Sequence, residues 1–494
     1  MKTIRIFLIV GISFALLQTT AQPLNFFKDN LYNLNYNPAS EVRVRGHIGI
    51  GISNLNLQLS TNIATYNDVI FRHGQGNKTI DLNGFFARIP KSSYGEVVVD
   101  LNNELLGFGF KIGEKAYFSF SSRLRLDASV SVPKDLFQMA KDGNIAHIDE
   151  ELNVLPLASA LLYTDHSIGL QYKISDKITV GARGKFLMGM AGANIKESNF
   201  RFTTDSEWNL HLKGDAFVNL YCPKDFINPV EGSINMYDLI QNGETNLFNA
   251  GNLTAGTVLG SSWGGGFDLG IDIKLPLNFG VKASLIDFGW LKWNRDQRGA
   301  TTYRISIDTT HPFYQDGELV FSGLPLESFD LNNNMSISQI IDNILKETKI
   351  DTAFLLTEET TESFVMRTNS KFFLEGYYQM KRHKFSALLR LDFLRERTMS
   401  SFTLGYNLNL KKILDVGVSY TMAKGSYRNL GIGFSFNPGD VFHFYVSAHN
   451  LFTVFFPYAN NNFNVQTGIF FTIPVKKPKK PVENDTPQEE NTKK

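Results

Sequence analysis

The sequence predicts an all-β protein that forms a single antiparallel transmembrane β-barrel of about 14 strands, with 16 as the alternative. Two observations lead to this fold class. Twelve stretches alternate apolar and polar residues in pairs joined by short turns, whereas the links between pairs are often long. Because successive side chains of a strand point to opposite faces, this alternation produces a sheet with one apolar and one polar side.

The clearest alternating stretch is residues 429–437. Its apolar face is expected to carry Leu430, Ile432, Phe434 and Phe436, and its polar face Asn429 and Ser435. A soluble sandwich would bury the apolar face against a second sheet. A barrel in a bilayer would expose it to lipid and keep the polar face around a lumen.

Strand length and loop length favour the barrel. Several stretches run ten residues or more, whereas globular strands have about five or six and tilted membrane strands about nine to eleven. The long links fall at 133–165, 191–262, 291–369 and 450–462. Outer-membrane barrels have short periplasmic turns and longer extracellular loops, while a sandwich has no reason to gather its long loops at one end. Short helices are expected in these loops at 134–141 and 338–349.

The strand count follows from the pairs and from parity. The pairs are 106–112 with 118–132, 168–174 with 178–188, 267–273 with 279–285, 372–380 with 385–393, 402–410 with 414–422 and 430–436 with 442–448, and a final strand covers 465–473. This gives thirteen strands from Glu104 onward. An even total with a periplasmic N-terminus needs one or three more, and the candidates are 46–59 and 80–89.

The ends of the chain predict export to the outer membrane of a Gram-negative cell. Lys2 and Arg5 precede an apolar run over 6–17, and small residues follow as far as Ala21, which is typical of a signal peptide over 1–21. The run is shorter than the roughly 20 apolar residues of a spanning helix. The mature barrel is then expected over 22–474. The Lys-Pro-rich and Glu-rich tail, 475–494, is expected to be disordered in the periplasm.

Composition narrows the possible functions. The net charge of +1 implies no nucleic-acid partner. The single Cys222 excludes an internal disulfide framework and a multi-cysteine metal site. His443, Ser447 and His449 share the polar face of one strand, but residues so spread do not make a reliable catalytic pair. We therefore predict no enzyme activity, no catalytic residue, no metal site and no cofactor.

Charged residues on the predicted polar faces are candidates for a network inside the barrel. They are Arg123, Arg125, Asp127, Lys173, Arg183, Lys185, Asp268, Asp272, Lys282, Arg390 and Asp392. An ion-selective pore would favour one sign of charge. Because the signs are mixed, the sequence predicts a salt-bridged network that braces a narrow or plugged interior.

One local motif points to a family. Residues 31–40, Leu-Tyr-Asn-Leu-Asn-Tyr-Asn-Pro-Ala-Ser, precede the first alternating stretch. They resemble the Asn-Pro-Ala segment of FadL-type long-chain fatty-acid transporters and of PorV-type secretion barrels. Together with the strand pattern and the helical inserts at 237–240 and 337–344, the chain most resembles an uncharacterised outer-membrane barrel family (domain of unknown function) related to both.

The resemblance implies a plug and a set of functions. Residues 22–45 would fold into the lumen as a hatch, with Asn37, Pro38 and Ala39 inside the barrel. From the residues alone, an ordinary turn leading into the first strand remains an alternative. The implied function is passage or binding of small hydrophobic molecules. The alternatives are a PorV-like component of a protein-secretion or surface-attachment apparatus, and a structural barrel without transport. The expected partners are outer-membrane lipid and either a hydrophobic small molecule or secretion-apparatus proteins.

Overall fold

The computed structural model of the chain describes fourteen segments of residues. They are 31–61, 70–72, 78–80, 94–221, 233–235, 262–293, 300–322, 352–360, 363–394, 398–410, 413–423, 426–438, 441–450 and 462–474. Several predicted features lie outside these residues: the signal peptide, most of the strand candidate at 80–89, the inserts at 237–240 and 337–349, and the tail.

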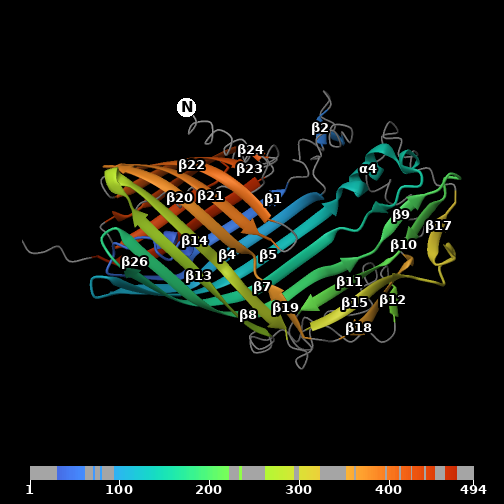
Figure 1. Ribbon diagram of the computed structural model, residues 1–494, viewed down its shortest axis with the longest axis horizontal. Coiled ribbons are helices and arrows are strands. Elements are labelled where there is room, and N and C mark those ends of the chain that lie inside the picture. Colours follow the sequence, from blue (N-terminus) through green and yellow to red (C-terminus); the bar gives the residue numbers. More distant parts are fainter. Residues whose placement is uncertain are drawn as a thin grey trace, which may run out of the picture.

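Within the described residues, fourteen strands form a closed antiparallel barrel, which confirms the predicted fold class (Figure 1). They are β1 (Gly46–Thr61), β4 (Tyr94–Ile112), β5 (Ala116–Pro133), β7 (Leu157–Lys173), β8 (Ile178–Ser198), β13 (Ser262–Lys274), β14 (Phe279–Trp293), β20 (Ser370–Met380), β21 (His383–Phe393), β22 (Thr398–Leu410), β23 (Leu414–Ala423), β24 (Ser426–Phe436), β25 (Phe442–Ala448) and β26 (Asn462–Ile473). The predicted first strand over 46–59 is β1. The barrel closes where β1 pairs with β26, with Gly46 opposite Ile473.

The two faces of the wall have the predicted chemistry. On β24, Phe434 and Phe436 are 41% and 43% exposed, whereas Asn429 and Ser435 are buried on the lumen side. The same alternation recurs around the barrel, so the outer surface is apolar and the inner surface polar. Closure leaves no sheet edge in the barrel wall, as a strand-built membrane protein requires. Separately, no helix of the described residues is long and apolar enough to span a membrane.

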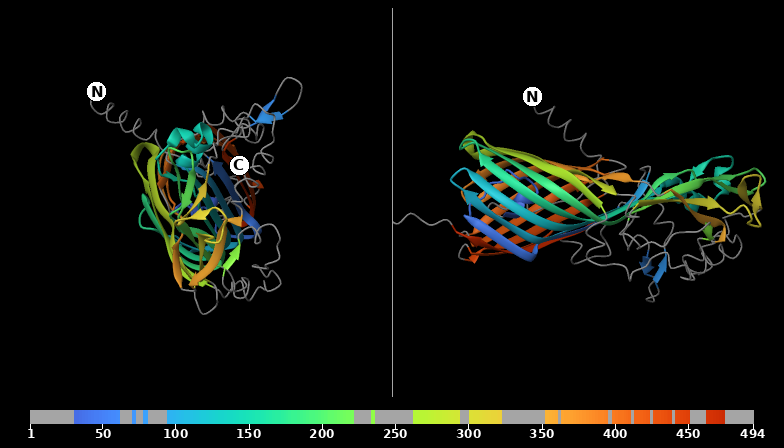
Figure 2. Two further views of the ribbon diagram at one scale, coloured as in Figure 1. Left: turned by 90° about the vertical axis from the view of Figure 1, so that its right-hand side faces the viewer. Right: turned by 90° about the horizontal axis from the view of Figure 1, so that it is seen from below.

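Part of the wall continues far beyond the barrel, which corrects the prediction that 133–165 and 191–262 are simply loops. β7 begins at Leu157 and β8 ends at Ser198, and the sheet is extended by β11 (Asp215–Tyr221), β15 (Ala300–Ile307) and β18 (Phe354–Thr360). Figure 2 shows this extension projecting from one end of the barrel. Periodicity does not reveal this extension at β15, because the first four residues of that strand are all buried and show no alternation of period two.

At the end of the extension, a second sheet packs on the first and forms a domain that we call the head. Its strands are β6 (Leu152–Asn153), β9 (Arg201–Thr204), β10 (Leu210–Lys213), β16 (Tyr314–Gln315) and β17 (Glu318–Phe321). Leu212, Leu319 and Phe321 pack against Ala216 and Ile307 of the extension. Helix α4 (Lys134–Asp142) follows β5 and confirms the helix predicted over 134–141. The head therefore lies at the long-loop end, opposite the short-turn end.

The head contains a histidine held between two carboxylates, from which a pH dependence follows. His211 Nε2 lies 3.2 Å from Asp205 Oδ2, and its Nδ1 lies 2.8 Å from Glu318 Oε1. Burial lowers the pKa of His211, but the hydrogen bonds to both acids outweigh burial and raise the pKa above 6.5. Because the folded pKa exceeds the unfolded one, this stabilisation is complete below about pH 6.5 and is lost as pH rises through the folded pKa.

We therefore predict that β10 becomes less protected as pH rises from about 6 to about 9. The measurement is amide hydrogen exchange, corrected for its intrinsic pH dependence, with the barrel strand β22 as the internal control. In the variant His211→Gln the protection of β10 should no longer depend on pH in this range. Equal pH dependence in the variant and the parent chain would contradict the assignment.

Candidate functional site

The segment before β1 lies inside the barrel, and we call residues 31–45 the plug. It begins with a 3₁₀ turn over Leu31–Asn35. The backbone N–H groups of Tyr36 and Asn37 then donate to Asn33 O. Asn37 Oδ1 accepts from Ala39 N at 2.8 Å, a local turn that suits the restricted backbone around Pro38. Ala39 is fully buried, so the predicted Asn-Pro-Ala residues lie in the interior.

Asn37 joins the plug to the barrel wall. Its Nδ2 donates to Ile271 O at 3.1 Å and to Ala283 O at 3.2 Å. These carbonyls belong to residues that face each other on β13 and β14. One side chain thus both closes the plug's turn and binds two wall strands.

Two glycines allow the plug to approach the wall. A Cβ atom at Gly181 of β8 would overlap the carbonyl group of Pro38, and one at Gly270 of β13 would overlap Asn37 Oδ1. Gly184 also lies on β8, but a Cβ there would meet no atom within 4 Å. The absence of side chains at Gly181 and Gly270 is therefore a requirement for this plug position.

Further hydrogen bonds hold the plug on the same side of the barrel. Gln171 Nε2 of β7 donates to Pro38 O at 3.2 Å and to Ser40 O at 2.5 Å. Ser284 Oγ of β14 donates to Tyr36 O at 2.5 Å. The plug is thus anchored to consecutive wall strands from β7 to β14.

Aromatic packing extends the plug across the lumen. Tyr32 and Tyr36 form one cluster with Phe373 of β20, Tyr445 of β25 and Phe470 of β26. The ring centroids of Tyr32 and Tyr445 are 5.3 Å apart, and those of Tyr36 and Phe373 are 5.6 Å apart. The plug therefore reaches from one side of the wall to the other.

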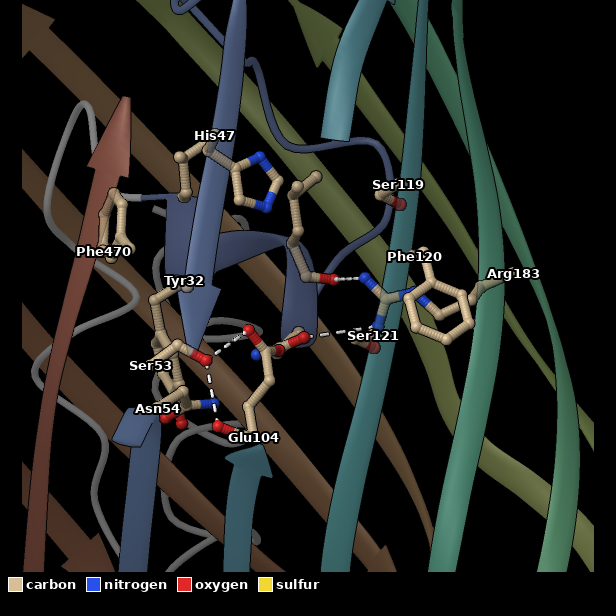
Figure 3. A pocket seen from close by; sticks show the side chains of 14 residues that line it. Tyr32, His47, Ser53, Asn54, Glu104, Ser119, Phe120, Ser121, Arg183 and Phe470 are labelled. Atoms are coloured by element: carbon tan, nitrogen blue, oxygen red, sulfur yellow. Dashed lines mark hydrogen bonds between the residues drawn. The ribbon is translucent and has the colours of Figure 1, made fainter. Parts of the chain in front are cut away.

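A small polar cavity remains between the plug, β1 and β4 (Figure 3). Its volume is about 40 Å³, room for a few water molecules only. Arg183 donates from the wall to Leu34 O at 3.0 Å, and Ser53 Oγ donates to Glu104 Oε1 at 3.0 Å. This cavity is therefore too small for a larger molecule.

The predicted charges on β5, β8 and β13 meet in a buried network. Lys185 Nζ lies 2.7 Å from Asp268, 2.5 Å from Asp287 and 3.4 Å from Asp165. Arg123 pairs with Asp165 at 2.8 Å and Arg125 with Asp287 at 3.1 Å. Two predicted residues join at its margin, with Arg183 lying 3.5 Å from Asp268 and Asp127 lying 3.8 Å from Arg125. Because opposite charges face each other at close range, the arrangement suits bracing rather than ion conduction.

The remaining predicted charges lie elsewhere. Asp272 and Lys282 lie 3.8 Å apart on β13 and β14. Arg390 and Asp392 pair at 2.8 Å on β21. Lys173 is the last residue of β7, and its side chain is 43% exposed. Its Nζ lies 2.8 Å from Asp176 Oδ1 in the adjoining turn. The structure therefore does not bring Lys173 into the lumen network.

Sequence reasoning missed several members of the network. Asp287 lies within a register shift between β13 and β14 and has a φ of 60°, so the strict alternation of β14 breaks there. Asp165 lies in a stretch that was predicted to be loop. Asp100, which pairs with Lys371 at 2.8 Å, precedes the predicted start of its strand and a second register shift at Glu104. Asp165 and Lys371 carry a usable signal, because the parity of each is opposite to that of a nearby outward residue, Ile168 and Phe372.

The wall also contains a groove on its outer side. It has a volume of about 730 Å³, and its lining includes Phe288, Trp290, Val365, Asn369, Phe393 and Leu394. A cavity of about 20 Å³ on the lumen side is lined by Asp100, Lys371 and Arg390, and also by Asn369 and Leu394. Asn369 and Leu394 therefore separate an outer groove from an inner cavity. Within the described part of the chain, no group of three or more His, Cys, Asp or Glu residues could hold a metal ion.

Comparison with protein families gives one match. Residues 38–448 match a family described as a family of unknown function, DUF5723. The chain belongs to this family. None of the curated proteins matches it.

Among solved structures, the DUF5723 chain is similar to outer-membrane barrels. A TodX deltaS2S3 mutant, a monoaromatic hydrocarbon channel, is 10% identical with a TM-score of 0.42, covering 92% of this chain and 99% of that one. The CymD monoaromatic hydrocarbon channel is 10% identical with a TM-score of 0.38, covering 94% and 98%. A Pseudomonas aeruginosa FadL homologue is 9% identical with a TM-score of 0.35, covering 92% and 98%. At these TM-scores the likeness carries no inference about function.

The glycine contact gives a first prediction for the site. Gly181→Ala should displace the plug or strain it by about 1–3 kcal/mol, the usual range for overpacking. The measurements are thermal stability in detergent and conductance in planar bilayers, where we expect a lower midpoint and larger or more frequent openings. Gly184→Ala, three residues along the same strand, is the matched control and should leave both unchanged. If the two variants behave alike, the plug does not depend on this contact.

The charge network gives a second prediction. Lys185→Met leaves three buried carboxylates short of a cation and should lower the free energy of unfolding by about 3–5 kcal/mol. Urea unfolding in detergent micelles measures this change. Lys173→Met removes a cation from the same protein but from an exposed pair, and should change stability by about 1 kcal/mol or less. A loss at Lys185 no larger than that at Lys173 would contradict the bracing role.

Proposed function

We propose that this protein binds small hydrophobic molecules in the outer groove and passes them through the barrel wall. The observation that carries the proposal is the groove of about 730 Å³, whose boundary residues Asn369 and Leu394 also line the inner cavity. Its volume lies within the range of about 300–1,000 Å³ that is typical of ligand pockets.

The lining suits an apolar ligand. Phe288, Trp290 and Val365 are 46%, 46% and 62% exposed on the outer surface, although they are large apolar side chains. Aromatic and aliphatic surfaces of this kind are the main component of small-molecule sites. A molecule dissolved in the hydrocarbon of the bilayer would reach them without crossing water.

The local backbone supports a passage at this place. Strand β19 (Phe364–Arg367) pairs with the upper part of β14 and β20 with its lower part, so the ladder is interrupted between them. Thr368 spans the interruption: its N–H donates to Gly289 O at 3.0 Å and its Oγ1 to Asp287 O at 2.6 Å. Asn369 follows directly and lines both cavities. In the proposed route, movement of the Asn369 and Leu394 side chains connects the two cavities, whereas an axial route would have to pass the plug.

The orientation is part of the proposal. Outer-membrane barrels place short turns in the periplasm and long loops outside, so the head would project from the cell and the short-turn end would face the periplasm. The signal peptide over 1–21 and the location in the outer membrane complete this proposal.

A second candidate function has one observation in its favour. The head is a packed β-structure beyond the barrel, and Trp208, in the turn between β9 and β10, is 50% exposed. A passage for small molecules does not need such a domain, whereas a PorV-like component of a secretion or attachment apparatus would use it to bind protein. Extraction in mild detergent followed by mass spectrometry separates the readings. Bound hydrophobic molecules support the first, and proteins that are lost after Trp208→Ser support the second. If neither bound molecules nor bound proteins are found, the result favours a structural barrel without transport.

The passage gives a third mutational prediction. Asn369→Trp should fill the boundary between groove and cavity, and should slow transfer of a fluorescent aromatic hydrocarbon into proteoliposomes at least about tenfold, because a bulky ring blocks the path without removing the outer groove. Val418→Trp places the same ring on the lipid-facing side of β23 and should have no effect. Transfer at the parental rate in Asn369→Trp would contradict lateral passage.

A further inference from the structure

The short-turn end carries a continuous set of six basic residues, which we call the basic arc: Arg45, Lys111, Lys115, Lys173, Lys177 and Lys274. They lie at the ends of β1, β4, β5, β7, β8 and β13, or in the adjoining turns. These strands are consecutive neighbours in the barrel. The arc therefore occupies one side of the barrel's rim.

Backbone hydrogen bonds hold these residues next to one another. Lys111 N donates to Arg45 O at 2.9 Å, Lys173 N to Lys115 O at 2.8 Å, and Lys274 N to Lys177 O at 2.7 Å. Like charges on paired strands repel each other and destabilise the sheet. The register of the barrel thus keeps three cation pairs together at an electrostatic cost.

The chain supplies little compensation for these charges. Asp176 pairs with Lys173 at 2.8 Å and Glu41 with Lys274 at 3.1 Å. The other four arc residues have no ion pair with any residue that the structure describes. Since the pairs that exist are largely exposed, they offset the repulsion between the cations only weakly. With Glu114, which lies in the turn between Lys111 and Lys115, three carboxylates lie among the six cations, so the arc keeps a net positive charge.

Exposed apolar side chains alternate with the arc. Ile112 is 50% exposed, Ile174 53%, Leu275 45% and Leu277 81%. Each of them is within three residues of an arc cation in the sequence. Cations beside exposed apolar groups are typical of surfaces that rest in the headgroup region of a bilayer, where the apolar groups enter the acyl boundary and the cations meet phosphate.

The opposite end of the protein has the opposite charge. Residues 199–221, 300–322 and 352–360, which include most of the head, contain eight acidic and three basic side chains. Among the described residues, these far-end ranges therefore carry a net negative charge, in contrast to the arc. An acidic soluble partner would explain the cations but not the exposed Leu277 or Ile174, so the observations favour a membrane surface.

We propose that the basic arc binds anionic phospholipid headgroups of the leaflet next to the short-turn end. The phosphates would lie between the paired cations, and Leu275 and Leu277 would enter the acyl boundary. Bound lipid would remove the repulsion between neighbouring turns and so stabilise the rim of the barrel. This binding does not depend on the groove or on the passage of any ligand.

The test compares lipid affinity in matched variants of the full chain in mild detergent. Native mass spectrometry during titration with phosphatidylglycerol or phosphatidylethanolamine gives the apparent dissociation constants. The parent chain should prefer phosphatidylglycerol. Each Lys near an anionic surface contributes a factor of about five in affinity, so Lys115→Gln with Lys177→Gln should weaken phosphatidylglycerol binding about 25-fold.

Two further variants serve as controls. Lys381→Gln with Arg382→Gln removes the same charge from an exposed turn at the same end but outside the arc, and should change affinity little. Lys115→Arg with Lys177→Arg retains the charge and should retain binding. Heat-modifiable gel migration checks that each barrel is folded.

Three outcomes would overturn the proposal. The parent chain could bind both lipids equally, or the arc and control variants could lose affinity equally. Soluble polyglutamate could also displace phosphatidylglycerol at equal charge concentration, which would identify an acidic polymer as the partner. A selective loss in the arc glutamine variant, restored by arginine and resistant to polyglutamate, would establish the lipid surface.

Discussion

The whole structure depends on one constraint: every backbone N–H and C=O group in the bilayer must find a partner within the protein. A strand-built chain satisfies it only by closing, and here β1 returns to β26. Closure sends every second side chain into a confined interior. Because charged groups cannot remain unpaired there, Lys185, Asp268 and Asp287 must meet one another. The polar network thus follows from the closure of the barrel, which pairs the backbone groups and at the same time directs these charged side chains into the interior.

The plug fills the space that closure creates, and wall and plug are shaped for each other. Gly181 and Gly270 let the plug backbone approach the wall, and Asn37 uses that proximity to bind carbonyls on two strands. The hydrogen bonds of the Asn-Pro-Ala segment lie on one side of the barrel, whereas the other side meets the plug mainly through aromatic rings. On that other side Gln466 Nε2 of β26 also donates a hydrogen bond to the Tyr36 hydroxyl, so a directional contact holds the plug on both sides of the barrel.

The two irregular places in the wall have different consequences. Near Ser53, an irregular register of β1 leaves a polar cavity against the plug, too small for a ligand. Near Asp287, the register shift in β14 coincides with the interruption between β19 and β20, and a large outer groove results. Bulges that re-aim side chains or interrupt pairing often lie beside functional sites. Here the bulge turns Asp287 inward to the charge network and leaves Phe288 on the groove side.

The sequence by itself determined the fold class, the strand count, the first strand and the faces of β24, because alternation of period two is a local property of the chain. It also singled out most of the charged network for the same reason, and it singled out Asn37 through the resemblance of the Asn-Pro-Ala segment to a known family. It did not reveal the extension, since β15 has buried residues on both faces, nor Asp287, since a bulge reverses parity. Only the tertiary structure decided which segments meet: the groove joins residues near 290, 367 and 394, and the basic arc joins six strand ends. These contacts depend on the register between strands, which is set by the closure of the whole barrel and by no short stretch of sequence.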